Sequence, residues 1–332
     1  MENIKELKTT LESKTILSNQ VFIVPHKSAD FDAIASAISM SLIIKKLGKP
    51  SYIIIEEEPT KIEPGVKNII EAIEDTVSII NLEKYSKLKT DNDLLITVDV
   101  NKSNLVCCKD YLKDFKNIIL IDHHNEDEFT IKTDTKYIDT KISSVSEILV
   151  DLLCMFRIKY NDSIANYLLA GIYLDTNKYT KNCPAKTMAT VSKLLDKGAD
   201  ITKVNEFFEE DFISDRKVQN LVNKANFFTY SIALCIEDDS VTYTKEELAK
   251  VADYLLRYKV DAAFAAGFID ENLISISARS KGKIDVSKIM KEFDGGGNKY
   301  SGASKIEDSN LSEIEKTLIK NIKPNFYIEE TE

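Results

Sequence analysis

The chain has 332 residues, enough for two domains of about 100–200 residues each, and its 43% hydrophobic and 30% charged residues are typical of a soluble globular protein. The 44 lysines and arginines against 54 aspartates and glutamates give a net charge of −10. This balance argues against a protein that binds long nucleic acid, because such proteins usually present a basic face.

The sequence contains no run of about 18 apolar residues, so it predicts no membrane span. Residues 1–14 alternate charges at helical spacing and lack the apolar stretch of a signal peptide. The five cysteines show no metal-ligand spacing, which fits a reducing compartment. We therefore expect a cytoplasmic protein, or a soluble segment of a larger one.

Short apolar strands alternate with helical segments in the first part of the chain. Strands are expected at 21–25, 51–55, 94–100 and 117–124, and helices at 32–47 and 66–73. Gly48 and Pro50 lie just beyond the first of these helices, where helix-ending residues belong. The alternation predicts parallel βαβ units and hence an α/β fold.

A helical region and a second α/β pattern follow. Helices are expected at 143–156, 162–179 and 186–198, and then in the charged amphipathic segment 206–225. Beyond it, strands are expected at 227–236, 260–269 and 273–280, and helices at 246–258 and 285–293. The sequence thus predicts a parallel-sheet domain over 1–205, a helical linker over 206–225 and a smaller α/β domain over 226–332.

All three histidines of the chain lie beside aspartates at predicted strand ends. His26 follows the first strand in the segment VPHKSADFDA, Asp99 follows LLITV, and Asp122, His123 and His124 follow NIILI. The carboxyl ends of parallel strands meet at one edge of a sheet, where ligand sites collect. We expect these side chains to converge there.

Imidazole and carboxylate groups without a nearby thiolate suit Mn²⁺ or a similar divalent ion. Asp30 and Asp32 are spaced so that they can point toward two ions, and Asp99 can bridge them. Asp175 ends the segment LLAGIYLD, which can return to the same edge. Alone, Asp99 or Asp175 would equally fit a helix cap or a turn, but the histidines favour metal binding. Two ions about 3.5–4 Å apart would generate a hydroxide and stabilise the oxygens of a phosphodiester.

The remaining residues of this cluster suggest supporting roles. Asp122 precedes two histidines, and it more plausibly orients an imidazole than binds metal directly. His124 more plausibly contacts a phosphate oxygen, or protonates the leaving group, than binds metal.

The motifs HKSADFDA, VDV, IDHH and AGIYLDT, in this order, resemble those of the DHH phosphoesterase superfamily. Residues 276–304, ISARSKGKIDVSKIMKEFDGGGNKYSGAS, resemble the end of its DHH-associated domain. The resemblance is closest to the catalytic region of bacterial cyclic-di-AMP phosphodiesterases. It implies an N-terminal DHH domain and a smaller α/β domain, with the active site in the cleft between them, and a homodimer.

The resemblance also implies roles for individual residues. One Mn²⁺ would be held by His26, Asp30, Asp99 and Asp175, and a second by Asp32, Asp99, His123 and Asp175. Asp99 and His123 would act in catalysis together with His124, which would contact the scissile phosphate. The other end of the substrate would be bound by Arg279, Gly295, Gly296, Gly297 and Asn298.

The glycine loop departs from the pattern of the family. Asp294 stands where the family has a first glycine, and Asn298 stands in place of a histidine. Asparagine keeps a hydrogen-bond donor and acceptor but cannot carry a positive charge. Lys299 is a candidate to supply that charge.

The expected function is hydrolysis of cyclic di-AMP, a bacterial second messenger, to 5′-pApA by two Mn²⁺ ions. One alternative is an oligoribonuclease (nanoRNase) or 3′-phosphoadenosine-5′-phosphate phosphatase that uses the same site. Another is a non-catalytic nucleotide-binding sensor, against which the complete set of metal ligands argues. The expected partner is therefore a cyclic dinucleotide or a short oligonucleotide.

Overall fold

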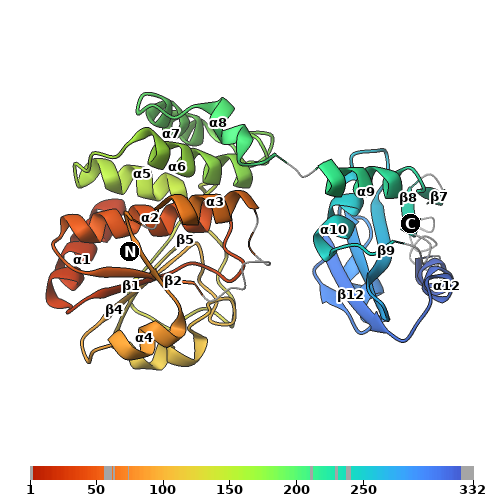
Figure 1. Ribbon diagram of the computed structural model, residues 1–332, viewed down its shortest axis with the longest axis horizontal. Coiled ribbons are helices and arrows are strands. Elements are labelled where there is room, and N and C mark those ends of the chain that lie inside the picture. The colour runs from red at the N-terminus through yellow and green to blue at the C-terminus, as the bar shows by residue number, and fades with distance from the viewer. Residues whose placement is uncertain are drawn as a thin grey trace, which may run out of the picture. The chain divides into compact units, whose positions relative to one another are not determined.

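The computed structural model describes residues 3–55, 62, 64–73, 75–209, 212–228, 231–236 and 241–322. The chain forms two compact units, Met1–Glu209 and Glu210–Glu332 (Figure 1). The predicted α/β class, with a parallel sheet in the first part and a smaller α/β unit after it, is confirmed. Among the described residues no helix has both the length and the apolar character needed to cross a membrane.

The first unit is built on a six-stranded parallel sheet with the strand order β3-β2-β1-β4-β5-β6. Its strands are β1 (Val21–Val24), β2 (Ser51–Ile54), β3 (Ser78–Ile80), β4 (Leu94–Val98), β5 (Asn117–Asp122) and β6 (Lys136–Ile138). The chain builds outward from β1 to β3, then crosses back to place β4 on the other side of β1. The strand order therefore reverses between β1 and β4, and such reversal points are where α/β sheets bind ligands.

Helices cover both faces of this sheet (Figure 1). They are α1 (Ile4–Leu17), α2 (Phe31–Lys46), α3 (Pro64–Ile73), α4 (Leu82–Leu88), α5 (Val145–Met155), α6 (Asp162–Asp175), α7 (Ala185–Leu195) and α8 (Ile201–Glu206). Alternate residues of β1 point to opposite sides, so that Ile23 belongs to the core under α2 while Phe22 packs with Tyr85 of α4. The central strands β1 and β4 are thus buried on both faces, as is typical of all-parallel sheets.

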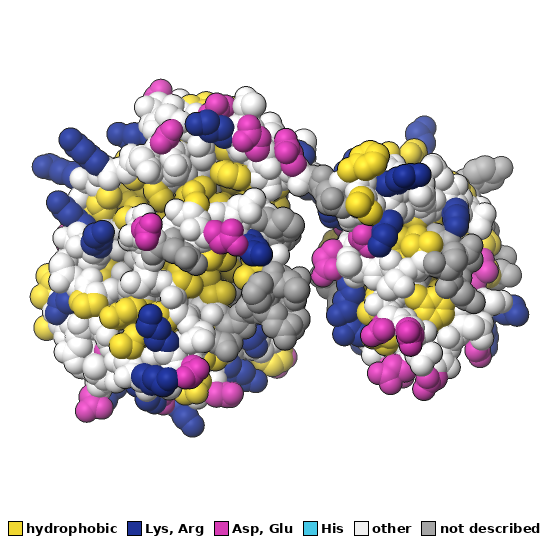
Figure 2. All heavy atoms as spheres, viewed as in Figure 1, with side chains coloured by type: hydrophobic (Ala, Val, Ile, Leu, Met, Phe, Trp, Pro, Cys, Tyr) yellow, Lys and Arg dark blue, Asp and Glu magenta, His cyan; other side chains and the backbone are white. Residues whose placement is uncertain are grey.

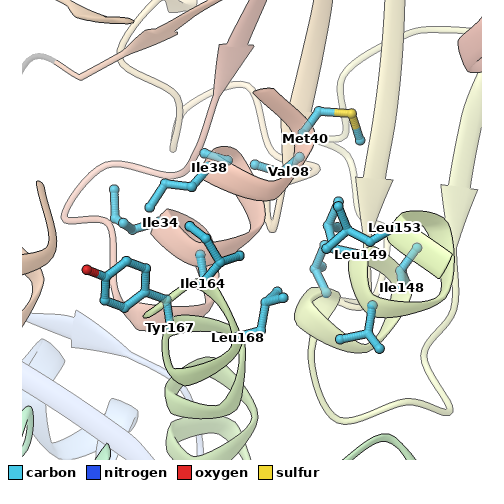
Figure 3. Close-up of a cluster of buried hydrophobic side chains, with 14 of the residues drawn as sticks. Ile34, Ile38, Met40, Val98, Ile148, Leu149, Leu153, Ile164, Tyr167 and Leu168 are labelled. Atoms are coloured by element: carbon cyan, nitrogen blue, oxygen red, sulfur yellow. The ribbon is translucent and has the colours of Figure 1, made fainter. Parts of the chain in front are cut away.

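The larger core lies between α2, α5 and α6. Figure 3 shows buried side chains of the three helices gathered in one cluster, among them Ile34 and Ile38 of α2, Leu149 of α5 and Leu168 of α6. Gly171 lets α6 approach α2, because a Cβ at that position would lie 2.8 Å from the Cα of Asp32. This close approach sets where the last residue of α6, Asp175, lies.

The second unit carries a six-stranded sheet with the order β11-β12-β10-β9-β8-β7, in which only the β8–β9 pair is parallel. Its strands are β7 (Asn226–Phe228), β8 (Ile232–Ile236), β9 (Ala262–Asp270), β10 (Leu273–Ser280), β11 (Gly296–Gly297) and β12 (Ser301–Glu307). Its helices are α9 (Phe212–Val222), α10 (Lys245–Leu255), α11 (Val286–Lys291) and α12 (Leu311–Ile322). One core packs α9 and α10 on the sheet, and another packs α11 and α12.

Two local predictions in this region are wrong. The single strand expected at 227–236 is two antiparallel strands, β7 and β8, with residues 229–230 outside the described range. The helix expected at 206–225 is not continuous, because α8 ends at Glu206 and the next described helix, α9, begins at Phe212. The border between the units falls between Glu209 and Glu210, and α9 packs within the second unit.

The surface carries charges of both signs. Figure 2 shows both lysines or arginines and aspartates or glutamates on the visible face, with several basic side chains together at its upper left edge. The net charge of the whole chain is −10.

Candidate metal centre and active site

Three neighbouring strands deliver the candidate ligands to one place. His26 lies two residues beyond β1, Asp99 directly follows β4, and His123 directly follows β5. Because β4 pairs with both β1 and β5 in parallel register, the three strands end side by side. All six predicted metal ligands meet there. They form two groups of close donor atoms, His26 with Asp30 and Asp99, and Asp32 with His123 and Asp175.

The first group is organised around Nε2 of His26. This atom lies 3.5 Å from Oδ2 of Asp30 and 3.5 Å from Oδ2 of Asp99. The other ring nitrogen, Nδ1, lies 2.7 Å from the carbonyl oxygen of Lys27. Since a carbonyl can only accept, Nδ1 carries the hydrogen, and the Nε2 of the neutral ring presents its lone pair to the carboxylates or to a metal.

The second group is organised around Nε2 of His123. This atom lies 3.4 Å from Oδ1 of Asp99 and 3.5 Å from Oδ2 of Asp175. Asp99 therefore turns one carboxylate oxygen toward each group, Oδ2 toward His26 and Oδ1 toward His123. The structure thus has the arrangement expected of a bridging ligand.

The backbone of Asp99 is unusual. Its φ of 58° lies in the left-handed region, which costs a residue other than glycine on the order of 1–2 kcal/mol. Its amide still donates to the carbonyl of Ile121, 3.0 Å away, so the pairing with β5 continues to this residue. The surrounding sheet thus holds in place a conformation that aims the buried carboxylate at both histidines.

Asp32 is held by the N-terminus of α5. Its Oδ2 accepts from the amide of Val145 at 2.7 Å, and its Oδ1 accepts from the amide of Ser146 at 2.8 Å. These amides have no partner inside their own helix, and the helix dipole favours a negative charge at this end. The side chain is fully buried, so its orientation is fixed by residues more than a hundred positions away in sequence.

Sequence reasoning missed this support from α5, although the segment SSVSEIL carries the signal of a serine cap before an apolar run. It also missed the buried Glu147, whose Oε1 accepts from the amide and hydroxyl of Ser143 and from the hydroxyl of Thr187. Glu147 thereby ties the start of α5 to α7.

Asp122 orients His124. Its Oδ1 accepts from the amides of His123 and His124, at 2.8 and 3.3 Å, and lies 2.8 Å from Nδ1 of His124. The side chain of His124 is 55% exposed, whereas Asp122 is fully buried. Contact with Asp122 raises the pKa of His124 against the opposing effect of burial. This geometry agrees with the orienting role expected for Asp122.

Several nitrogen and oxygen atoms of the centre that could bind a metal are buried and have no hydrogen-bond partner in the described part of the chain. They are Oδ1 of Asp99, Oδ2 of Asp122, Nε2 of His123 and Oδ2 of Asp175. Buried polar atoms are nearly always partnered, so these atoms need an explanation. Imidazole nitrogens and carboxylate oxygens are ligands for divalent metals such as Mn²⁺, and the residues present fit such an ion.

The pKa values in the centre are shifted because several carboxylates lie close together. Burial and the charges of Asp32 and Asp99 raise the pKa of Asp175. Burial lowers the pKa of His26, but Asp30 and Asp99 outweigh it and raise that pKa to about 11. In the same way Asp99 and Asp32 outweigh burial and raise the pKa of His123 to about 9. Without a cation, the raised pKa values favour protons on His26, His123 and Asp175, which offset the charge of the carboxylates.

The predicted substrate residues lie together at one end of the second sheet. Arg279 of β10 is paired with Ser301 of β12, next to the glycine loop. Its Nε donates to Oδ1 of Asp253 in α10, at 2.9 Å, a partner that sequence reasoning missed.

The glycine loop is held by its own side chains and backbone. Oδ1 of Asn298 accepts from the amides of Tyr300 and Ser301, at 2.8 and 3.0 Å. The amide of Gly295 donates to the carbonyl of Met290. Gly297 has a φ of 140°, and a Cβ there would lie 2.2 Å from the carbonyl oxygen of Ser301. Only Gly296 of the three glycines is open, since nothing lies within 4 Å of its Cβ position.

Comparison with known proteins agrees with this architecture. Residues 20–172 match the DHH family, N-terminal domain, and residues 227–323 match the DHHA1 domain. Over 329 residues the chain is 29% identical to the cyclic-di-AMP phosphodiesterase PdeA of Listeria monocytogenes, covering 95% of this chain but 49% of that protein. Over 222 residues it is 29% identical to the bifunctional oligoribonuclease and PAP phosphatase NrnA of Mycoplasma pneumoniae, covering 63% of this chain and 67% of that protein.

A solved structure shares the fold. The exopolyphosphatase-related protein from Bacteroides fragilis superposes with a TM-score of 0.76 at 21% identity, covering 97% of this chain and 98% of that one. At this identity the likeness shows the fold alone. The chain spans about half the length of the Listeria relative.

We predict that Asp99→Asn weakens Mn²⁺ binding at least tenfold and abolishes metal-dependent hydrolysis, because the amide removes the charge shared by both ligand groups. Isothermal titration with Mn²⁺ and a hydrolysis assay measure the two effects. Asp110→Asn, which changes an exposed aspartate of the same unit, serves as the control and should change neither. Unchanged Mn²⁺ affinity in Asp99→Asn would contradict the bridging role.

Mn²⁺ binding should strengthen as pH rises from 6 to 8. The pKa values of His26 and His123 are raised to about 11 and about 9, so both rings are protonated over this range in the metal-free site and must lose a proton to bind metal. Each proton released strengthens binding about tenfold per pH unit, so the affinity should increase at least tenfold per unit. Titrations in buffers of different ionisation enthalpy count the protons, and a pH-independent affinity would refute the expectation.

Proposed function

Because the chain carries a DHH N-terminal domain and a DHHA1 domain, we propose that it is a metal-dependent phosphodiesterase that hydrolyses cyclic di-AMP to 5′-pApA. The observation that carries this proposal is the convergence of two histidines and four aspartates, with the carboxylate of Asp99 divided between them. The choice of cyclic di-AMP rests on the likeness to PdeA over 95% of the chain.

We propose that the centre holds two Mn²⁺ ions. The carboxylates of Asp30, Asp32, Asp99 and Asp175 carry four negative charges when ionised, which two divalent cations would balance. His26, Asp30 and Asp99 would hold one ion, and Asp32, His123 and Asp175 the other, with Asp99 contributing to both. Divalent cations in such a pair activate water at neutral pH and offset the charge of phosphate oxygens.

The side chains of the first unit would orient the reactants. In the reaction, the oxygen of water forms a bond to phosphorus, the bond from phosphorus to the 3′-oxygen breaks, and that oxygen takes a proton. His124 would contact the phosphate or supply this proton; the contact of its Nδ1 with Asp122, which raises the pKa of the ring, supports this role. Asp122 itself would act only through His124.

The second unit would bind the remainder of the dinucleotide. Arg279 offers a planar guanidinium, which suits a phosphate, and Asp253 fixes its orientation. The open backbone at Gly296 allows a ligand to approach closely. Gly295, Gly297 and Asn298 would contribute by holding the shape of the loop, since their amides or side chains are used within it.

The five cysteines support the proposed cytoplasmic location. None of the five is joined in a disulfide, and two are buried, Cys108 and Cys235. Cysteines without disulfides are typical of reducing compartments.

The likeness to NrnA favours a second candidate, hydrolysis of short oligoribonucleotides or of 3′-phosphoadenosine-5′-phosphate (pAp). The test is Mn²⁺-supported turnover of cyclic di-AMP, pApA and pAp, measured side by side. We expect the highest kcat/KM for cyclic di-AMP. Preference for pApA or pAp would favour the second candidate, and tight binding of a nucleotide with no turnover would favour a sensor.

Arg279→Ala should raise the KM for the dinucleotide about tenfold or more, because a hydrogen bond to a charged group contributes about 1.5–3 kcal/mol. The kcat should fall less, since the metal ligands lie in the other unit. Steady-state kinetics check both values. Lys305→Ala, an exposed cation on the neighbouring strand β12, is the matched control, and an equal effect there would argue against a specific role for Arg279.

A further inference from the structure

The chain leaves the first unit beside the metal ligands. Phe207 and Phe208 follow α8 and directly precede Glu209, the last residue of that unit. The ring of Phe208 lies 4.5 Å from the ring of Phe31 and 5.4 Å from that of Tyr173, centroid to centroid. The ring of Phe207 lies 6.1 Å from that of Phe31. The exit segment is therefore packed on two helices at once, α2 and α6.

Both helices supply metal ligands at the points of contact. Phe31 stands between Asp30 and Asp32 in the first turn of α2, and it is 1% exposed. Tyr173 lies two residues before Asp175 at the end of α6. A single side chain, Phe208, thus contacts neighbours of ligands from both groups.

Other contacts hold the same segment. The hydroxyl of Tyr173 donates to Oδ1 of Asn205, 2.7 Å away. In α3, a Cβ on Gly65 would lie 2.2 Å from the carbonyl oxygen of Phe207 and 2.6 Å from Cζ of Phe31. The packing around the exit segment is therefore tight enough to require glycine at position 65.

The ligands are also held by hydrogen bonds that do not involve the exit segment. Asp32 is held by the amides of Val145 and Ser146, and Asp30 caps α2 through the amide of Ala33. Loss of the Phe208 ring should free the exit segment while leaving these hydrogen bonds in place.

We propose that Phe208 is a positioning residue that fixes, against the ligand-bearing helices, the point at which the chain leaves the first unit. It thereby limits the length of chain that tethers the second unit, with Arg279 and the glycine loop, to the first. The effective concentration of a tethered group falls steeply as its tether lengthens. This inference rests on the proposed function, in which the second unit binds the dinucleotide and the first unit carries the chemistry.

The test compares two substrates in wild type and Phe208→Ala. Bis(p-nitrophenyl) phosphate needs only the metal centre, whereas cyclic di-AMP also needs the second unit. We expect the KM for cyclic di-AMP to rise about tenfold in Phe208→Ala, with kcat/KM for the chromogenic substrate and the Mn²⁺ affinity within twofold of wild type. Phe208→Tyr, which keeps the ring, should restore the KM.

Phe156→Ala is the matched control, since Phe156 belongs to the same core but lies at the far end of α5. It should lower the melting temperature, and any change in kinetics should be the same for the two substrates. Equal losses on both substrates in Phe208→Ala, or no loss on either, would overturn the proposal.

Hydrogen exchange gives a readout that needs no activity. The amides of Phe207, Phe208 and Glu209 donate to the carbonyls of Val204, Asn205 and Glu206, so their exchange with solvent requires these hydrogen bonds to open. In Phe208→Ala these amides should exchange at least tenfold faster, and unchanged exchange would refute the proposal that Phe208 holds this segment. If wild type hydrolyses neither substrate, the proposed function fails, and the exchange rates still decide whether Phe208 holds the segment.

Discussion

The carboxylate of Asp99 is the point on which the candidate site depends. It lies where the strand order reverses, buried between His26 and His123, and turns one oxygen toward each. Three further carboxylates crowd around the two histidines, and burial makes their mutual repulsion severe. Such a cluster is stable only with protons or cations bound, so the same feature explains the raised pKa values and the fit to divalent metal.

The rest of the first unit holds these charges in place. The N-terminus of α5 binds both oxygens of Asp32, and Gly171 allows α6 to pass close enough to bring Asp175 to the same spot. Because these contacts join α2, α5 and α6, the core between the helices and the geometry of the ligands form one structure. A change in the packing of these helices would therefore be felt at the site.

In the second unit, most of the residues expected to bind substrate are used to build the loop in which they lie. Three of the residues expected to bind substrate, Gly295, Gly297 and Asn298, are engaged in building their own loop, and Arg279 is oriented by Asp253. Asparagine suits this position because its side-chain oxygen accepts from two following amides. The departure from the histidine of the family thus has a local structural use, whatever ligand the loop binds.

The sequence by itself determined the α/β class, the parallel sheet and the convergence of the six candidate ligands, since these residues lie at the ends of strands and helices whose patterns are local and parallel strands end at one edge. It did not determine the break between β7 and β8, because two short apolar strands and a long one share the same composition. Nor did it show that α5 binds Asp32 or that Phe208 packs on Phe31. These contacts join residues more than a hundred positions apart, and only the tertiary structure decides which distant groups meet.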